Sequence, residues 1–489
     1  MSEAPPLPTK GGEPRKPASQ RIPGIALPFV GDRAKKMLDI VEKFVEEECI
    51  PSDLVWQAQL GTGDERWDGH PSILEDLKKK AKSLGIWNMF LPKNHYSNLS
   101  EYDPTNSAGA FTNLEYGLMC ELLGRARTAS EACNCAAPDT GNMEVIARYG
   151  TADQKKKWLT PLLAGQIRSG FLMTEPDKAS SDGSNISLNI RKEGNELVLN
   201  GSKWWSSGAG DDRCKIYIVM GRDNDADDSV DRYKRQSMVL VPSDAKGLTV
   251  HRMLSVYGYD DAPHGHGHIT FKDVRVPASN ILLGHGRGNE IMQGRLGPGR
   301  IHHAMRSIGA AEVALEWMIA RLNDERKVPF GKPLREHGVL IDWVARSRLE
   351  IDAAKLVVLN ASVKIDQGDA KGALVEIAES KILTPNMALT VIDRAVQAHG
   401  AMGVCQDTPL ASMWAHLRTL RIADGPDEVH LNQLGRRENR ARAQECIDRI
   451  QMQKQKAAEL MKQYGVQEKQ LGGSKVAGFA AQSYLQSKL

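Results

Sequence analysis

Three histidines near the middle of the chain, His264, His266 and His268, alternate with other residues. Successive side chains of a β-strand point to opposite faces, so this spacing places the three imidazoles on one face. Imidazole is a common metal ligand, and the pattern invites a metal site. No further residue nearby is placed to complete a four-coordinate site, and we therefore expect no bound metal.

Seven cysteines are scattered along the 489 residues. The one close pair, Cys133 and Cys135, is separated by a single residue, whereas zinc sites usually have two to four residues between their cysteines. An odd number at irregular spacing predicts free thiols in a reducing compartment rather than a disulfide framework.

The overall composition excludes several classes of protein. Hydrophobic residues make up 41% and charged residues 26%, which is ordinary for a globular chain. The net charge of +3 is too small to indicate nucleic-acid binding. The sequence contains no run of about 18 apolar residues, so it predicts no membrane span. The sequence has no Gly-x-Gly-x-x-Gly after a strand, which disfavours a Rossmann fold.

The two ends of the chain have distinct patterns. The last three residues, Ser487, Lys488 and Leu489, form the address that the peroxisomal import receptor reads, so we expect this receptor as a partner and the peroxisome as the location. The first 28 residues are rich in proline and include Glu3 and Glu13, which is unlike a mitochondrial transit peptide. We expect them to form a disordered arm.

Apolar periodicity predicts helices at both ends of the folded region. Residues 33–49 and 72–84 repeat at helical spacing, and 142–164 give further short helices. A long helix is expected at about 338–367, and another at 372–399. In the first of these, one apolar face is formed by Leu349, Ala353, Leu356, Leu359 and Val363.

The middle of the chain has a different pattern. Short apolar runs separated by turn residues predict a small antiparallel β domain. Within it, Gly194 and Asn195 predict a hairpin turn between strands at 186–192 and 196–200. The expected fold class is α+β. The expected parts are a disordered arm (1–28), an N-terminal helical domain (29–167), a middle β domain (168–285), a C-terminal helical domain (286–465) and a tail (466–489).

Five local motifs accompany this order of elements, at residues 171–176, 200–209, 330–334, 397–403 and 423–430. They read Phe-Leu-Met-Thr-Glu-Pro, Asn-Gly-Ser-Lys-Trp-Trp-Ser-Ser-Gly-Ala, Phe-Gly-Lys-Pro-Leu, Gln-Ala-His-Gly-Ala-Met-Gly and Ala-Asp-Gly-Pro-Asp-Glu-Val-His. Together with the order of helices, β domain and helices, they resemble the acyl-CoA dehydrogenase family. The resemblance implies bound FAD and an acyl-CoA substrate.

The first two motifs are implied to contact the flavin ring. In the family the Thr-Glu-Pro loop supplies donors that stabilise the reduced flavin, which assigns Phe171, Met173 and Thr174 to the cofactor. Ser181 is implied beside the cofactor and the pantetheine arm of the substrate, with Ser180 as the alternative. Trp205 and Ser207 share one face of their strand and are implied to pack against the flavin.

The third and fourth motifs are implied to reach the FAD of a neighbouring subunit. In the family an Arg before the Phe binds the pyrophosphate; here the position holds Lys327, and Arg326 is the alternative. Phe330 belongs to the same contact. The glycine-rich turn after the long helix is implied to cover the cofactor, through Gln397, Gly400, Ala401 and Gly403. The resemblance therefore implies a homodimer or homotetramer.

The fifth motif holds the implied catalytic base, Asp424, where the family usually has Glu. Its side chain is shorter by one C–C bond, about 1.5 Å. Gly425 is implied to contact substrate, and Pro426 and Glu428 to contact the cofactor. Burial against flavin and substrate is expected to raise the pKa of Asp424, because desolvation disfavours the carboxylate.

The implied reaction forms a trans-2-enoyl-CoA, as in fatty-acid breakdown. Asp424 removes the α-proton, the β-hydrogen passes to the flavin, and an oxyanion hole that includes the backbone N–H of the base stabilises the enolate. The stretches 137–143 and 297–303 resemble one branch, the dehydrogenase domain of family members 10 and 11. Arg300 in the second stretch is implied to line the substrate channel, with an interhelical salt bridge as the alternative.

Three other functions share parts of this pattern. Nitroalkane oxidase has the same fold with an Asp base, although Arg300 and the Ser181 loop argue for a CoA substrate. Acyl-CoA oxidases share the ancestry but usually carry a further C-terminal domain. A flavin-bound protein without catalysis is the least favoured, because Asp424 is present and the net charge is small.

Overall fold

The computed structural model describes residues 15–92, 98–368 and 372–466. The chain divides into two units, 1–427 and 428–489. Within its described residues, the second unit consists of the continuation of one charged helix, α13 (Asp427–Gln463). The Ser487-Lys488-Leu489 signal lies outside the described residues. None of the described helices has the length and apolar character needed to cross a bilayer.

The first unit has the expected order of helices, β domain and helices, and the α+β prediction is confirmed. The N-terminal helices are α1 (Asp32–Phe44), α2 (Ile50–Leu60), α3 (Ser72–Ser83), α4 (Asn113–Leu123), α5 (Ala129–Ala132), α6 (Asp139–Tyr149), α7 (Ala152–Gln154) and α8 (Thr160–Ala164). The C-terminal helices are α9 (Gly288–Leu322), α10 (Gly338–Gln367), α11 (Leu374–His399) and α12 (Leu410–Arg418).

The β domain contains seven strands in one sheet. They are β1 (Arg168–Leu172), β2 (Asn189–Glu193), β3 (Glu196–Ser207), β4 (Cys214–Asp223), β5 (Gln236–Pro242), β6 (Leu248–Met253) and β7 (His266–Pro277). The predicted hairpin is confirmed: Glu193 pairs with Glu196, and Gly194 turns the chain at φ 57°. The prediction of an antiparallel sheet is wrong in part, because β4 pairs in parallel with both β1 and β2.

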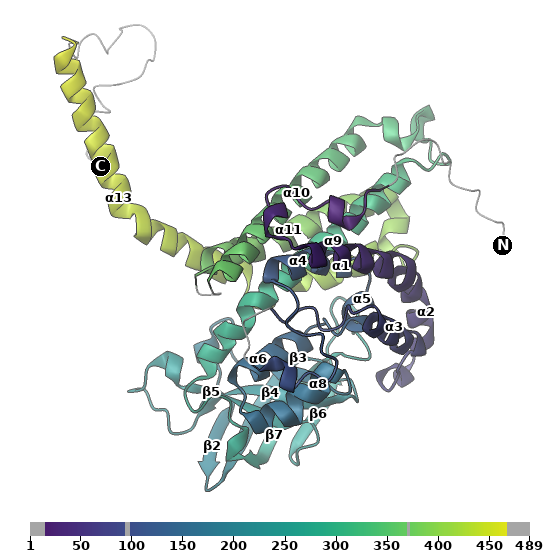
Figure 1. Ribbon diagram of the computed structural model, residues 1–489, viewed down its shortest axis with the longest axis vertical. Helices are drawn as coiled ribbons and strands as arrows, with labels where there is room; N and C mark the ends of the chain where they lie inside the picture. The colour runs from purple at the N-terminus through teal and green to yellow at the C-terminus, as the bar shows by residue number, and fades with distance from the viewer. Residues whose placement is uncertain (1–14, 93–97, 369–371, 467–489) are drawn as a thin grey trace. The chain divides into compact units, whose positions relative to one another are not determined.

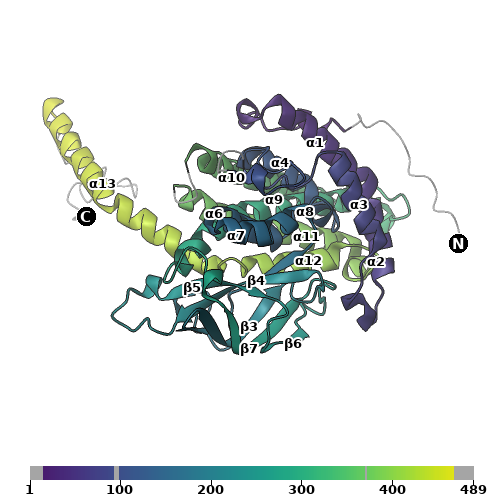
Figure 2. The ribbon, with the colours of Figure 1, turned by 60° about the horizontal axis from the view of Figure 1, so that its bottom comes forward.

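In Figures 1 and 2 the strands gather on one side of this unit, and α4, α9, α10 and α11 gather on the other. Helix α6 contacts both α9 and strand β1. Local sequence signals explain several boundaries. The side chains of Thr112 and Thr151 each cap a helix, and the residue three positions later completes a capping box.

Two sequence expectations are corrected by the packing. On α10, Leu349 is 71% exposed and Leu356 45% exposed, whereas the buried face carries Ile351, Ala354 and Val358. Apolar residues occupy more than one face of this helix, and periodicity alone does not say which face meets the neighbouring helices. The packing also corrects the expectation of disorder for residues 15–28.

Residues 15–28 of that arm are ordered against α1. The backbone N–H of Ala18 donates to Glu42 Oε2 at 2.8 Å, and Ser19 donates to both carboxylate oxygens of Asp39 at 2.8 Å. Ala18 and Ala26 are buried. Proline content suggested disorder, but acidic side chains on α1 satisfy the backbone donors of this segment.

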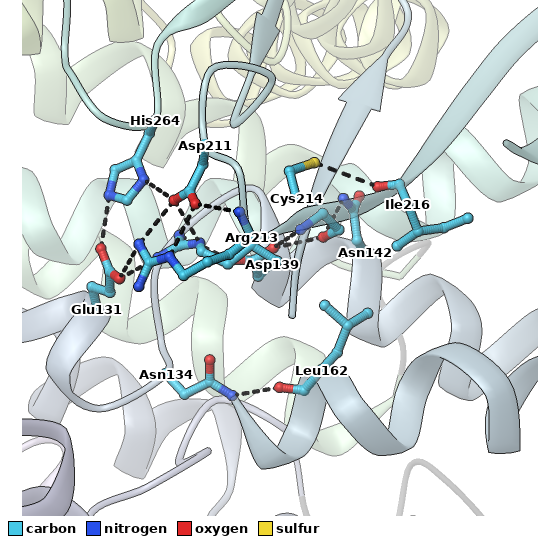
Figure 3. Close-up of polar contacts among 12 residues, drawn as sticks. Glu131, Asn134, Asp139, Asn142, Leu162, Asp211, Arg213, Cys214, Ile216 and His264 are labelled. Carbon is cyan, nitrogen blue, oxygen red and sulfur yellow. Dashed lines mark hydrogen bonds and ion pairs between the residues drawn. The ribbon is translucent and has the colours of Figure 1, made fainter. Parts of the chain in front are cut away.

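A buried ion-pair network joins the N-terminal helices to the β domain (Figure 3). His264 donates through Nε2 to Glu131 at 2.7 Å and through Nδ1 to Asp211 at 2.9 Å. Arg168 reaches Glu131 at 2.6 Å and Asp139 at 2.9 Å. With a carboxylate at each ring nitrogen, His264 serves as a charged link between helix and sheet. Although burial lowers the pKa of His264, Glu131 and Asp211 outweigh it and the net shift is upward.

This arrangement predicts a pH-dependent contribution to stability. The pKa of His264 is raised above its unfolded value near 6.5, so the stabilisation is complete below about pH 6.5 and is lost as the pH rises through the folded pKa. We expect His264→Gln to lower the free energy of unfolding by about 2 kcal/mol at pH 6, because Glu131 and Asp211 each lose one charged hydrogen bond while Arg168 and Arg213 remain. Denaturant titrations at pH 6 and pH 9 measure the free energy of unfolding of the wild type and the variant. The difference between the two proteins should be smaller at pH 9. The exposed His251→Gln is the control, and an equal loss at both pH values would contradict the prediction.

Candidate functional site

The Thr-Glu-Pro loop follows strand β1 and is held by a buried ion pair. Lys203, on β3, donates to Glu175 Oε1 at 2.8 Å and to the carbonyl of Met173 at 2.7 Å. Glu175 also accepts from the backbone N–H of Leu188 at 2.7 Å. These contacts fix the loop on both sides of Thr174. Glu175 and Lys203 belong to two separate sequence motifs, and their pairing depends on the fold, which brings the loop after β1 against strand β3.

The serine of this loop that contacts the protein is Ser180. Its hydroxyl accepts from the backbone N–H of Glu175 at 3.0 Å, so Ser180 closes the loop. Ser181 is exposed. This division of roles favours Ser181 as the residue available to a ligand.

Strand β3 brings the second motif beside the first. The backbone N–H of Trp204 donates to the carbonyl of Thr174 at 3.0 Å. At Trp205 the strand is irregular, with φ 52°, and the ring is 39% exposed with its centroid 5.6 Å from that of His266. Ser207 shares a hydrogen bond of 2.9 Å with His266 Nδ1. Trp205 and Ser207 thus meet at one imidazole, although the strand between them is not regular.

The three alternating histidines have separate partners. His264 belongs to the ion-pair network, His266 contacts Ser207, and His268 Nε2 lies 3.1 Å from the Ser202 hydroxyl.

Accessible groups beside Trp205 fit the requirements of a flavin. The ring of Trp205 is exposed, and Thr174, whose carbonyl accepts from the backbone N–H of Trp204, brings a hydroxyl group to the same place. An exposed aromatic ring beside a hydroxyl donor suits a planar, polar-edged cofactor.

Asp424 occupies a turn that other side chains hold through its backbone. Its φ is 57°, and that of Gly425 is 102°. Arg300 Nε donates to the carbonyl of Asp424 at 3.1 Å, and Lys381, on α11, donates to the carbonyl of Gly425 at 3.2 Å and to that of Leu420. The structure therefore brings Arg300 to the predicted base, rather than into a salt bridge between helices.

Asp424 is a carboxylate at neutral pH. Burial raises its pKa, but His303, followed by Arg295, Arg300 and Lys381, outweighs burial, and the pKa lies below its ordinary value. Burial and Arg306 lower the pKa of His303 itself to about 3, so the full positive charges around Asp424 are those of Arg295, Arg300 and Lys381. The sequence did not reveal these cations, and the expected rise of the Asp424 pKa on burial against flavin and substrate stays a prediction.

Arg295, on α9, connects Asp424 to the Thr-Glu-Pro loop and was missed by the sequence analysis. Its guanidinium lies 3.8 Å from the centre of the Phe171 ring, and its charge lowers the pKa of Asp424. Nearby on α6, burial raises the pKa of Glu144 to about 8, so Glu144 is mostly protonated at neutral pH and leaves the charge of Arg295 in place. A lone arginine within a helix gave no signal of this position.

Two implied cofactor residues lie beyond Asp424. Pro426 is half-buried at the end of the turn. Glu428 begins the second unit of the chain.

The third and fourth motifs form a second cluster at the far end of α9. Arg321 donates to the carbonyl of His399 at 3.2 Å, which places the 397–403 turn beside the loop that carries Lys327. Phe330 is 98% exposed, and Gln397, Gly400 and Ala401 are exposed, whereas Gly403 packs against Val396. Arg300 and Arg321 lie on one helix, about 32 Å apart at about 1.5 Å per residue. One chain therefore does not bring the two clusters together.

A local ion pair indicates which of Arg326 and Lys327 is available to bind the FAD pyrophosphate. Arg326 donates to both carboxylate oxygens of Asp324, at 2.8 and 3.0 Å. Its guanidinium fork is engaged on the loop itself, which favours Lys327 for an external phosphate.

Three models of one protein family match most of the chain. They are described as the N-terminal, middle and C-terminal domains of acyl-CoA dehydrogenase, and they match residues 31–166, 170–274 and 286–438.

Individual relatives agree. The chain is 50% identical over 414 residues to acyl-CoA dehydrogenase family member 10 of Mus musculus, covering 84% of this chain and 37% of that protein. It is 47% identical to the probable acyl-CoA dehydrogenase IBR3 of Arabidopsis thaliana, covering 83% of this chain and 50% of that protein. It is 49% identical to the probable acyl-CoA dehydrogenase FadE2 of Mycobacterium tuberculosis, covering 75% of this chain and 86% of that protein. The chain thus spans half or less of the length of the first two.

Among solved structures, a putative acyl-CoA dehydrogenase from Mycobacterium abscessus is 45% identical, with a TM-score of 0.78. The similarity covers 83% of this chain and 98% of that structure. Butyryl-CoA dehydrogenase from Megasphaera elsdenii is 26% identical with a TM-score of 0.68, covering 83% and 98%.

Proposed function

Because this chain belongs to the acyl-CoA dehydrogenase family, we propose that it is an FAD-dependent enzyme that converts an acyl-CoA thioester to its 2-enoyl-CoA. The observation that carries the proposal is the carboxylate of Asp424 on a turn that Arg300 and Lys381 hold through its backbone carbonyls. A general base must be deprotonated before it can take a proton, and the lowered pKa of Asp424 meets this requirement. The family binds FAD, and the exposed ring of Trp205 beside the Thr174 loop suits that cofactor.

Different residues of the chain have different roles in the proposed reaction. Asp424 removes the α-proton, and Arg300 and Lys381 hold the backbone of its turn through carbonyl oxygens. Positive charge at Arg295, Arg300 and Lys381 also favours negative charge that develops on the thioester oxygen. FAD, when bound, accepts the β-hydrogen and the electron pair. Lys203 and Glu175 keep the Thr174 loop in place beside it.

Asp424→Asn tests the base directly. An amide cannot accept the α-proton, so we expect the variant to retain FAD and to lose about 10²- to 10⁴-fold in the rate of flavin bleaching by acyl-CoA. The measurement is an anaerobic spectral titration with acyl-CoAs of several chain lengths, with nitroethane as the comparison substrate. Asp393→Asn, an exposed residue on α11, is the matched control. Full activity of Asp424→Asn, or bleaching of the wild type by nitroethane alone, would overturn the proposed function.

We also propose that the enzyme is a homodimer or homotetramer in which FAD contacts two chains. The separation of about 32 Å between Arg300 and Arg321 supports this, because a cofactor at Trp205 and Asp424 lies far from Lys327 and Phe330 of the same chain. The exposed Leu349 and Leu356 on α10 supply apolar surface of the kind that subunit contacts bury.

Sedimentation and flavin content test the shared cofactor. We expect a mass that is a multiple of 53.8 kDa. Lys327→Met should lower the FAD bound per chain, because it removes the phosphate partner. Arg326→Met should retain more FAD, because Arg326 is already paired with Asp324. A monomer that holds one FAD per chain would contradict the proposal.

We further propose that the enzyme acts in peroxisomal fatty-acid breakdown. The support is the terminal Ser487-Lys488-Leu489, which the import receptor recognises. Deletion of Leu489 should leave a fluorescent N-terminal fusion in the cytosol, because the receptor reads the complete tripeptide. Microscopy of Gln486→Ala, which keeps the tripeptide, provides the control. Continued import after the deletion would show that this tail is not the signal.

A further inference from the structure

His303 lies one helical turn after Arg300 on α9 and approaches the carboxylate of Asp424. The distance from His303 Nε2 to Asp424 Oδ2 is 3.7 Å. A hydrogen bond needs about 2.9 Å, and a small rotation of either side chain closes the difference. The His303 side chain is 24% exposed and that of Asp424 is 19% exposed, so both are shielded from bulk water.

Arg306 fixes which nitrogen of His303 carries the proton. Its guanidinium lies 3.1 Å from His303 Nδ1. A guanidinium only donates hydrogen bonds, so Nδ1 must accept with its lone pair. In the neutral ring the single proton is then on Nε2, the nitrogen that faces Asp424.

The charge state of the ring agrees with this tautomer. Burial, followed by the charge of Arg306, lowers the pKa of His303 to about 3, despite the opposing effect of Asp424. The ring is therefore neutral at physiological pH, and its Nε2 is a donor with no lone pair. It cannot take a proton from Asp424, which excludes His303 as a second base.

The direction of the Asp424 carboxylate matters for removal of the α-proton. Arg300 and Lys381 bind main-chain carbonyls of the turn, so their hydrogen bonds set the backbone and not the direction of the side chain. The side chain is also one C–C bond shorter than that of Glu, and misplacement of a reacting group by about 1 Å can cost about 10²-fold in rate.

We infer that His303 is a positioning residue: held by Arg306 as an Nε2–H donor, it orients the carboxylate of Asp424 toward the substrate α-carbon. The inference rests on the proposed function, because it assigns a role only if Asp424 is the base. A neutral donor directs the carboxylate without adding another full positive charge to a site that already has three. The other groups that act on Asp424 are unchanged by substitution of His303: Arg295, Arg300 and Lys381.

Paired variants of His303 separate orientation from simple packing. His303→Leu removes the donor, and we expect flavin reduction at saturating acyl-CoA to fall about 10- to 100-fold. Loss of a donor to the carboxylate also raises the pKa of Asp424, so the acidic limb of the rate–pH profile should move to higher pH. His303→Gln returns an amide N–H and should restore most of the rate and the position of the limb. His302→Gln, at the neighbouring buried ring, is the control and should leave the limb in place.

A second readout does not depend on activity. In protein labelled with ¹⁵N-histidine, the His303 signals are those that disappear in His303→Leu. We expect them to report a neutral ring with the proton on Nε2 throughout pH 5–9. Protonation within that range, or a proton on Nδ1, would overturn the inference.

The outcomes distinguish this inference from the proposed function. An active Asp424→Asn enzyme would remove the base itself. If Asp424→Asn is inactive but His303→Leu matches the wild type, only the role of His303 is wrong. Equal losses in His303→Leu and His303→Gln without a shift of the acidic limb would show that the ring only packs, and would likewise overturn the inference.

Discussion

The half-buried carboxylate of Asp424, the proposed base, constrains much of this protein. Burial alone would hold Asp424 protonated, because desolvation disfavours its charged form. Cations on two helices reverse that tendency: Arg295 and Arg300 come from α9, and Lys381 comes from α11. The packing of these helices against the 420–427 turn is therefore an electrostatic requirement as well as a matter of core formation.

The β domain forms the other side of the site, where a buried ion pair holds the Thr174 loop. Lys203 and Glu175 are buried, and each gains hydrogen bonds to backbone groups beyond their own ion pair. A buried ion pair tolerates its desolvation only when its remaining hydrogen-bonding capacity is satisfied, as it is here. The result is a Thr174 loop held beside the exposed ring of Trp205. Arg295, stacked on Phe171, joins this wall to the base.

Helix α9 separates the two clusters of residues implied to bind the cofactor. It carries Arg295, Arg300 and His303 near one end and Arg321 near the other, with about 32 Å between Arg300 and Arg321. A straight helix of this length cannot bring its ends to one ligand. Residues that the family resemblance assigns to one cofactor thus form two separate clusters within a chain, and a second copy of the chain provides the simplest way to unite them.

The sequence by itself determined the order of the elements, the hairpin at Gly194 and the family, and it pointed to Asp424 as the proposed base. These depend on local spacing, turn chemistry and short motifs, all of which are read along the chain. Tertiary structure alone decided which face of α10 is buried, that residues 15–28 pack on α1, and that His303 approaches Asp424. It also brought the cations that lower the pKa of Asp424 around this carboxylate. The physical reason is that electrostatic interaction depends on distance in space and not on separation along the chain. Arg295 and Arg300 lie more than a hundred residues before Asp424, and Lys381 lies on the separate helix α11.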